Sequence, residues 1–318
     1  MLLGITRTLG RAKVVLATRY LFSNWLSLIF RYILVRLGFS VKLIAKVDEC
    51  AVELDPQSFR RLVSGFSRGL IKFVKRVNGG FLVNDVKVKD INEVQFLETW
   101  AQVLGWSYNT VCDCWVKDWV KFKNMYWSIL EVFDYGEYSA LNVNGKLVVD
   151  VGAFVGDSSI YFALKGARRV IAIEPEPRAY EEMLKNIKLN RLEGVIYPVN
   201  AKLVSGSSEL CAKESNSTVP VITLSEVISR YGVECDAVLK MDCEGCEHDI
   251  IINDYESVKL FSELIFEYHV DEKRSLSKFL RILARDYQCR VLLGRKYLGV
   301  IHCTRKFFLR PSIIERSW

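Results

Sequence analysis

Residues 146–175 read KLVVDVGAFVGDSSIYFALKGARRVIAIEP, and this stretch decides the fold. Residues 147–151 form a short apolar run that ends in a glycine turn, which is typical of a buried parallel strand. Polar residues 157–159 supply N-cap chemistry for the helix that follows. A second apolar run, residues 170–173, ends on Glu174. The stretch therefore predicts a strand–helix–strand unit with ligand-binding groups at the carboxyl ends of both strands.

The turn between the first strand and the helix carries Gly152 and Gly156. Glycines let a ligand approach the backbone closely, and a helix N-terminus presents free N–H groups. The third glycine of the nicotinamide-binding pattern is missing, which argues against NAD. Asp150 would repel a pyrophosphate but would hold a cationic amino group, and Glu174 suits two ribose hydroxyls. S-adenosylmethionine carries an ammonium, a sulfonium and a ribose, so it fits this pattern better.

Five sequence blocks follow one another along the chain. They are DVGAFVGDSS at 150–159, IEPEP at 173–177, NIKLN at 186–190, LKMDCEG at 239–245 and FEYH at 266–269. In this order and spacing they resemble the core of the FkbM-type methyltransferases, a family of class I S-adenosylmethionine-dependent enzymes. The resemblance implies an α/β fold with a Rossmann-like, mostly parallel sheet in the order 3-2-1-4-5-7-6, whose last strand is antiparallel.

The strand ends and the resemblance together give a set of candidate cofactor-binding residues. The set is Glu131, Tyr138, Asp150, Gly152, Ala153, Gly156, Asp157, Ser158, Glu174, Pro175, Asn200, Ala201 and Asp242. The resemblance implies that Glu131 and Tyr138 face the cofactor from a cap that precedes the first core strand. It also implies that Asn200 and Ala201, which follow the third strand, contact the adenine.

Catalytic candidates follow the fourth and fifth strands. Methyl transfer is an in-line displacement at a carbon that the sulfonium activates, so the protein mainly aligns the acceptor and takes its proton. Histidine has a pKa range that suits a base near neutral pH, which favours His269. Asp242 or Glu244 could instead accept the proton, and His269 would then be a hydrogen-bonded structural residue. Asp242, Glu267 and His269 also suit Mg²⁺ or Mn²⁺, but the sequence does not show that they converge, and no metal site is predicted.

Charge and element type divide the remainder of the chain. The protein has 318 residues and a net charge of +7, and half of its residues are apolar, which are too many for disorder. Residues 1–127 hold 19 Lys and Arg against 10 Asp and Glu, so the remainder is close to −2. Short hairpins and helices alternate through this first part. We expect an N-terminal α+β accessory domain over residues 1–127 and the methyltransferase domain over residues 128–318.

Residues 1–46 carry eight basic residues and no acidic one. Their longest uncharged run has 11 residues, short of the ~20 that a membrane-spanning helix requires. Arginines at 19, 31 and 36 interrupt any signal-peptide core. Two interpretations remain for this basic, apolar helix. It packs its apolar face on the rest of the protein, which is the preferred interpretation, or it lies on an anionic membrane surface.

Aromatic residues and cysteines need separate interpretation. Residues 106–138 are dense in aromatics, which favours a packed core over a wall of the acceptor pocket. Nine cysteines are scattered without regular disulfide or zinc spacing, which is typical of a reducing, intracellular setting. The close pairs Cys112/Cys114 and Cys243/Cys246 are therefore expected to be incidental.

The predicted function is methyl transfer from S-adenosylmethionine to a hydroxyl oxygen of a saccharide, glycolipid or secondary metabolite. We expect a cytoplasmic protein with a small-molecule or glycan acceptor, in possible peripheral membrane contact through residues 1–46. An RNA methyltransferase is the first rival, because the basic N-terminal half permits it. No recognised RNA-binding module is visible, so nucleic acid is not an expected partner. The other rivals are a nicotinamide oxidoreductase and a catalytically silent module that keeps the cofactor fold.

Overall fold

The computed structural model describes residues 2–206, 219–269, 276–294 and 298–306. The chain divides into two compact units, residues 1–135 and residues 136–318. The second unit begins at residue 136, and the expected domain boundary at residues 127 and 128 stays a prediction. Each unit is described by itself below.

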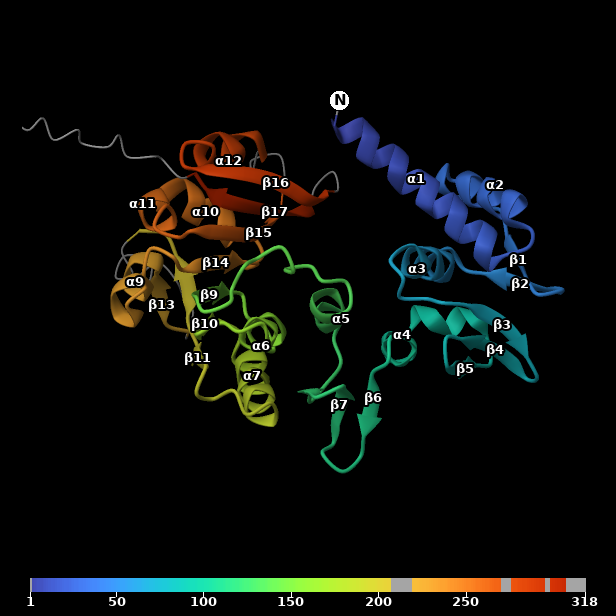
Figure 1. Ribbon diagram of the computed structural model, residues 1–318, viewed down its shortest axis with the longest axis horizontal. Helices are drawn as coiled ribbons and strands as arrows, with labels where there is room; N and C mark the ends of the chain where they lie inside the picture. Colours follow the sequence, from blue (N-terminus) through green and yellow to red (C-terminus); the bar gives the residue numbers. More distant parts are fainter. Residues whose placement is uncertain (1, 207–218, 270–275, 295–297, 307–318) are drawn as a thin grey trace, which may run out of the picture. The chain divides into compact units, whose positions relative to one another are not determined.

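The second unit is built on a seven-stranded sheet in the order β11-β10-β9-β14-β15-β17-β16 (Figure 1). Its strands are β9 (Leu147–Val151), β10 (Arg169–Ile173), β11 (Ile196–Val199), β14 (Val238–Met241), β15 (Glu263–His269), β16 (Tyr287–Gly294) and β17 (Leu298–Arg305). The first five are parallel, and β17 runs antiparallel to β15 and β16. Counted along the chain, the order is 3-2-1-4-5-7-6, so the predicted Rossmann-like class I methyltransferase sheet is confirmed.

Helices cover both faces of this sheet. They are α6 (Asp157–Leu164), α7 (Pro177–Leu189), α9 (Leu224–Tyr231), α10 (Cys246–Asn253), α11 (Tyr255–Val258) and α12 (Leu276–Leu283). Val149 and Val151 of β9 join one core with side chains of α9, α10 and α12. Side chains alternate along a strand, so Asp150 points to the opposite face, where it meets Ser158 of α6. Because β9 and β14 are parallel neighbours, their carboxyl ends lie side by side where the strand order reverses.

A short parallel pair of strands leads into α9. It consists of β12 (Lys202–Val204) and β13 (Val221–Thr223), whose residues Leu203 and Ile222 join the same core. A surface loop or hairpin is predicted between them, over residues 205–220, and most of it lies outside the described residues. Thr223 and Glu226 form a capping box that fixes the start of α9.

The first unit alternates small α and β elements, as its sequence pattern predicts. Its helices are α1 (Leu2–Leu21), α2 (Trp25–Arg36), α3 (Pro56–Ser67), the 3₁₀ helix η1 (Ile91–Gln95), α4 (Leu97–Val103) and α5 (Trp127–Phe133). Its strands are β1 (Leu43–Val47), β2 (Cys50–Leu54), β3 (Val74–Val77), β4 (Gly80–Val83), β5 (Val86–Val88), β6 (Ser107–Asn109), β7 (Cys114–Lys117) and β8 (Val120–Phe122). The amphipathic pattern of residues 92–104 predicts a single helix, but extended backbone at Phe96 separates η1 from α4.

The basic N-terminal segment forms two helices rather than one, and they pack on their own unit. Phe22 and Leu28 are buried, and the ring of Tyr32 lies 4.7 Å from that of Phe59. Asn24, in the break between the helices, donates to the Ile44 carbonyl at 2.8 Å and accepts from the Lys46 N–H at 2.8 Å. One face of the segment therefore packs on the rest of the first unit, as the preferred interpretation expects. A search of the described helices finds none with the length and apolar character to cross a membrane.

Most of the dense aromatic segment forms a core within the first unit. The ring of Trp106 packs against Phe122 and Phe133, at centroid distances of 6.0 and 6.1 Å. Its indole N–H donates to the Asp134 carboxylate at 2.9 Å. Trp119 is an exception, because this residue is 74% exposed at the turn between β7 and β8.

Three pairs of cysteines in the described residues are joined by disulfides: Cys112–Cys114, Cys243–Cys246 and Cys289–Cys303. The expectation that the two close pairs are incidental is therefore wrong. Cys289 and Cys303 stand directly opposite each other in the register of β16 and β17. This third pairing depends on strand register, which cysteine spacing does not show.

Candidate functional site

The glycine turn after β9 is closely packed on two sides. Gly152 has a φ of +72°, and a Cβ there would collide with the backbone carbonyl of Asp242. Gly156 has a φ of +86°, and a Cβ there would lie 2.9 Å from the side chain of Met183. Both positions therefore require glycine, since the left-handed conformation and the neighbouring chain each exclude a side chain. The consequence is that the ends of β9 and β14 touch, and that α6 begins directly beside them.

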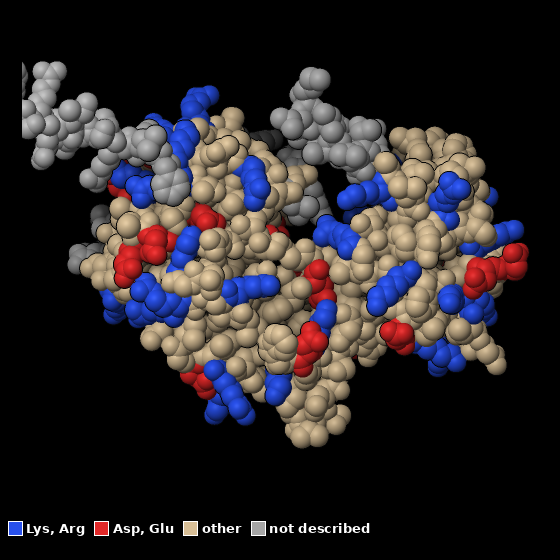
Figure 2. Space-filling view, viewed as in Figure 1, with Lys and Arg blue, Asp and Glu red and all other residues tan. Residues whose placement is uncertain are grey.

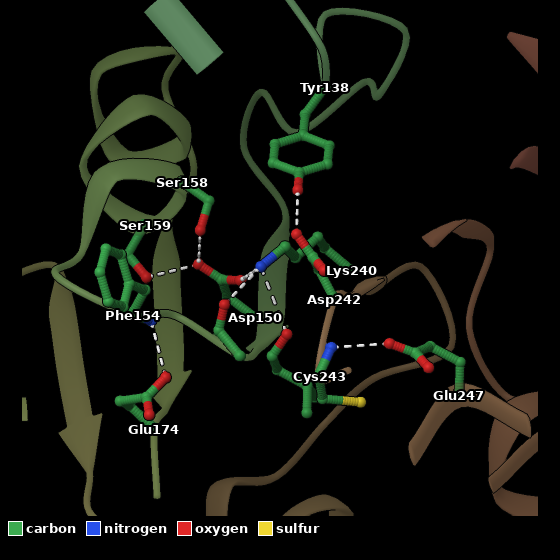
Figure 3. Close-up of polar contacts among 12 residues, drawn as sticks. Tyr138, Asp150, Phe154, Ser158, Ser159, Glu174, Lys240, Asp242, Cys243 and Glu247 are labelled. Carbon is green, nitrogen blue, oxygen red and sulfur yellow. Dashed lines mark hydrogen bonds and ion pairs between the residues drawn. The ribbon is translucent and has the colours of Figure 1, made fainter. Parts of the chain in front are cut away.

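Asp150, at the end of β9, is fully buried and lies among donors (Figure 3). Its carboxylate accepts hydrogen bonds from the hydroxyls of Ser158 at 2.7 Å and Ser159 at 2.6 Å. Its other oxygen lies 3.0 Å from the ammonium of Lys240. The sequence suggests that Asp150 holds the ammonium of a cofactor, but the ammonium that it holds in this structure belongs to Lys240.

Lys240 is a residue of the site that the sequence pattern did not single out. Only 1% of the residue is exposed, and its ammonium donates to the carbonyls of Gly152 at 2.7 Å and Val151 at 3.3 Å. Burial lowers the pKa of this ammonium, but Asp150 and Asp242 outweigh that effect and raise the pKa above its ordinary value. Lys240 therefore stays charged and ties the glycine turn to β14. One signal for this pair was present in the sequence. Lys240 stands inside the apolar run 238–241, and a lysine that is buried in a strand requires a partner of opposite charge.

Tyr138 and Asp242 join the segment that precedes the sheet to the end of β14. The Tyr138 hydroxyl donates to the Asp242 carboxylate at 2.9 Å (Figure 3). Tyr138 is 3% exposed, and burial together with the Asp242 charge raises the pKa of its hydroxyl well above the ordinary value. The structure thus brings Tyr138 to the strand ends. Glu131 belongs to α5 of the first unit, and its contact with a cofactor stays a prediction.

Glu174, at the end of β10, is held by backbone donors. It accepts from the N–H groups of Phe154 at 2.8 Å and Glu176 at 2.7 Å. Burial raises the pKa of its carboxyl group, and the two N–H groups oppose that shift. Each carboxylate oxygen can accept a second hydrogen bond, so the geometry is compatible with a grip on two ribose hydroxyls.

Three further candidates lie around the ends of β10 and β11. The Asn200 side chain donates to the carbonyls of Glu174 at 2.8 Å and Pro175 at 3.3 Å. Ala201 is buried beside it. These contacts fix the ends of the two strands relative to each other. The proposed contact of Asn200 and Ala201 with adenine stays a prediction.

Asp242 has a second partner in Glu267 of β15. Met241 pairs with Phe266 in the register of β14 and β15, so the residues that follow each of them are neighbours. Burial, the Asp242 charge and the nearby Glu137 and Glu244 raise the pKa of Glu267 to about 9. Glu267 is therefore protonated at neutral pH, which the sequence did not suggest.

The loop after β14 carries the remaining acidic candidate. Glu247 accepts from the N–H groups of Cys243 at 2.6 Å and Gly245 at 2.9 Å, which holds the loop against the start of α10. Glu244, at the tip, is exposed and has a φ of +57°. A cavity of about 370 Å³ adjoins this loop and is lined by β12, the loop and α10.

His269 is the last residue of β15, and its side chain lies outside the described residues. Its role as a base therefore stays a prediction. In the part of the chain that the structure describes, no three His, Cys, Asp or Glu side chains converge as metal ligands. The groups that do converge are Asp150, Lys240, Asp242, Tyr138 and Glu267.

Comparison with known proteins adds to this geometry. Residues 113–215 match a family model described as the TRM5/TYW2 methyltransferase domain. The uncharacterized protein 158B of Sulfolobus islandicus rod-shaped virus 1 is 28% identical over 46% of this chain and 75% of its own length. The tRNA (guanine(37)-N(1))-methyltransferase Trm5b of Methanocaldococcus jannaschii is 31% identical over 33% of this chain and 36% of its own. The ribosomal protein L11 methyltransferase of Anoxybacillus flavithermus is 33% identical over 36% of this chain and 35% of its own. The chain thus spans about a third of the length of the two named methyltransferases.

These matches change some expectations and confirm others. The matched family model is TRM5/TYW2 rather than FkbM. The expected partners, a small-molecule or glycan acceptor with nucleic acid unlikely, are wrong, because a tRNA methyltransferase is among the relatives. The expected cofactor, S-adenosylmethionine, is confirmed. The chain therefore carries an S-adenosylmethionine-dependent class I methyltransferase domain.

Proposed function

We propose that this protein methylates RNA, and that its acceptor is a nucleobase of a tRNA. The observation that carries the proposal is the match of residues 113–215 to the TRM5/TYW2 methyltransferase domain. The 31% identity with a tRNA methyltransferase supports the same acceptor class. The distribution of charge within the chain agrees with it.

The first unit accounts for the whole net positive charge of the protein. Residues 1–135 contain 19 Lys and Arg against 12 Asp and Glu, whereas the remaining residues contain 25 of each. Figure 2 shows Lys and Arg side chains spread over the surface of the first unit, on the right of the view. Cations that neutralise phosphates dominate the affinity for nucleic acids and position the chain without reading its sequence. We assign this role to the first unit.

The strand ends of the second unit have the opposite character. Asp242, Glu244 and Glu137 gather there around Glu267, and such a site repels phosphate. The acceptor must therefore enter as a group without a phosphate charge. Enzymes that modify a base meet this condition by taking the base out of the stack, away from its backbone.

The chemistry follows from the groups at the strand ends. S-adenosylmethionine, when bound, supplies a methyl group on a sulfonium. Lys240 and Asp150 fix the glycine turn, and Glu174 is positioned to hold the ribose. Asp242 is positioned to receive the proton that the acceptor loses as it takes the methyl group.

The direct test is incubation of the full chain with unmodified tRNA transcripts and S-adenosylmethionine labelled in its methyl group. Label should enter the RNA, and digestion with mass spectrometry would identify the methylated nucleoside and atom. Asp242→Asn should lower incorporation by roughly 10²–10⁴, the range for a positioned general base. Label in a ribosomal protein preparation, with none in RNA, would overturn the proposal.

A further inference from the structure

The loop between β14 and α10 is closed by a disulfide that the proposed chemistry does not use. Cys243 follows Asp242 directly, and its partner Cys246 is the first residue of α10. A Cβ on Gly152 would collide with the carbonyl of Asp242 and would lie 3.3 Å from the Cα of Cys243. One half of the disulfide therefore belongs to the backbone that packs directly on the glycine turn.

The backbone of this loop has an uncommon conformation. Glu244 has a φ of +57° and Gly245 a φ of +115°. A residue with a side chain is rare in the left-handed region and stays there when its surroundings hold it. Glu247 holds the loop from the inside by accepting from the N–H groups of Cys243 and Gly245, and the disulfide joins the two ends of the loop. Opening the disulfide removes one of these restraints, so the loop gains other conformations.

Access separates this disulfide from the other two that the structure describes. Cys243 and Cys246 are both partly exposed, and both line the cavity of about 370 Å³ beside the loop. In each of the other pairs one cysteine is fully buried, Cys114 in the first and Cys303 in the second. A reductant must reach a sulfur atom to open the bond, so exposed disulfides are the labile ones. Among these three, Cys243–Cys246 is the disulfide that a reductant should open first.

We propose that Cys243 and Cys246 form a reversible redox site, whose reductant is a dithiol and whose disulfide form holds the loop against the glycine turn for cofactor binding. A disulfide that fixes a loop in its binding conformation raises affinity, because the loop no longer has to be ordered when the ligand binds. The inference goes beyond the proposed function, since it concerns S-adenosylmethionine and is independent of the acceptor.

The reduction proceeds by two exchanges. A thiolate of the dithiol attacks the sulfur of Cys243, the bond between the cysteines breaks, and Cys246 leaves as a thiolate. The position of Cys246 at the N-terminus of α10 favours this, because free N–H groups there stabilise a negative charge. The second thiolate of the dithiol then attacks the dithiol sulfur that is bound to Cys243, and Cys243 leaves. The dithiol becomes a disulfide, two electrons pass to the protein, and the two protons of the dithiol end on the cysteines.

The test uses the full chain with S-adenosylhomocysteine as the ligand. One sample is kept oxidised, and another is treated with dithiothreitol, which is then removed in oxygen-free buffer. Alkylation with mass spectrometry identifies the reduced cysteines, and calorimetry measures the affinity. Reduction of Cys243–Cys246 should weaken binding by roughly tenfold, the effect of having to order a few side chains again on binding. Oxidised glutathione should restore both the disulfide and the affinity.

Two double variants assign the response to this pair. Cys243→Ser/Cys246→Ser should bind as the reduced parent does, with or without dithiothreitol. Cys112→Ser/Cys114→Ser is the matched control, and it should keep the response of the parent.

Four outcomes would overturn the proposal. Dithiothreitol leaves Cys243–Cys246 intact, or the pair is reduced and the affinity does not change. Cys243→Ser/Cys246→Ser still responds to dithiothreitol, or circular dichroism shows that the reduced parent unfolds, in which case the disulfide stabilises the whole fold rather than the loop. The comparison of oxidised and reduced parent needs no variant, so it decides the matter even where a variant does not fold.

Discussion

The two units use charge in opposite ways. In the second unit, some charged side chains are buried or partly buried near strand ends and paired, as Lys240 is with Asp150 and Lys146 is with Glu263. In the first unit most basic side chains are exposed, and they outnumber the acidic ones. Buried pairs hold atoms in fixed positions, whereas an exposed surplus attracts a partner of opposite charge and is screened by salt. In this chain, the second unit uses charge to hold atoms in position, and the first unit uses charge to attract a partner.

The largest expected effect comes from breaking the buried pair in the second unit. Lys240→Met leaves the Asp150 carboxylate buried with its hydroxyl donors and no cation. Removing one partner of a buried ion pair costs about 3–5 kcal/mol of unfolding free energy. Urea denaturation would measure it.

The double variant Lys240→Met/Asp150→Asn sharpens the result. It removes both charges, so its loss of unfolding free energy should be smaller than that of Lys240→Met alone. Lys185→Met, at an exposed site on α7, is the matched control and should have little effect. Losses that simply add in the double variant would contradict a coupled pair.

The next effect concerns the cofactor grip at the end of β10. Glu174→Ala should weaken the binding of S-adenosylhomocysteine by about 1–3 kcal/mol, the range for losing charged hydrogen bonds. Calorimetry would measure this, with NADH as the ligand that should not bind. An unchanged affinity in the variant would remove the ribose assignment.

A third effect tests the surplus of basic side chains in the first unit. Replacing exposed Arg19, Arg36 and Lys46 by Gln should weaken tRNA binding and reduce its dependence on salt. If each contacts a phosphate, the slope of log affinity against log salt should fall by roughly 2–3. The matched control replaces Arg178, Lys185 and Lys188, which are exposed in the second unit. Equal losses from both triple variants would mean that the two units do not differ in this respect.

The sequence predicts much of the second unit because its first parallel strands are mostly apolar runs that end in turns. Residues 147–151 and 170–173 are such runs, and their order along the chain is enough to place Asp150 and Glu174 at strand ends. Lys240 is different, because its meaning depends on which side chain lies across from it on β9. The sequence around a lysine in a strand does not show which side chain of the neighbouring strand will pair with it. The same holds for Glu267, whose raised pKa depends on the end of β14 being its neighbour.

The first unit is less predictable for a physical reason. Strands β6 and β8 have only three residues each, so alternation of apolar and polar residues has little length in which to show. The capping box of Asp90 with Glu93 fixes the start of η1, and extended backbone at Phe96 ends this helix before α4 begins. Such local competition is decided by backbone hydrogen bonds, which hydrophobic periodicity does not report.

The smallest expected effect is a change in how stability depends on pH. The pKa of Glu267 is raised from 4.5 to about 9, so between these values the folded chain keeps a proton that the unfolded chain has released. The contribution of Glu267 to stability is therefore complete below about pH 4.5 and is lost as the pH rises toward 9. Glu267→Gln cannot titrate, so its stability relative to the parent should rise through that window and be constant on either side. Solvent screening of this partly exposed group keeps the effect small. Urea denaturation at a series of pH values would measure the difference, and a difference that does not change with pH would show that Glu267 titrates alike in both states.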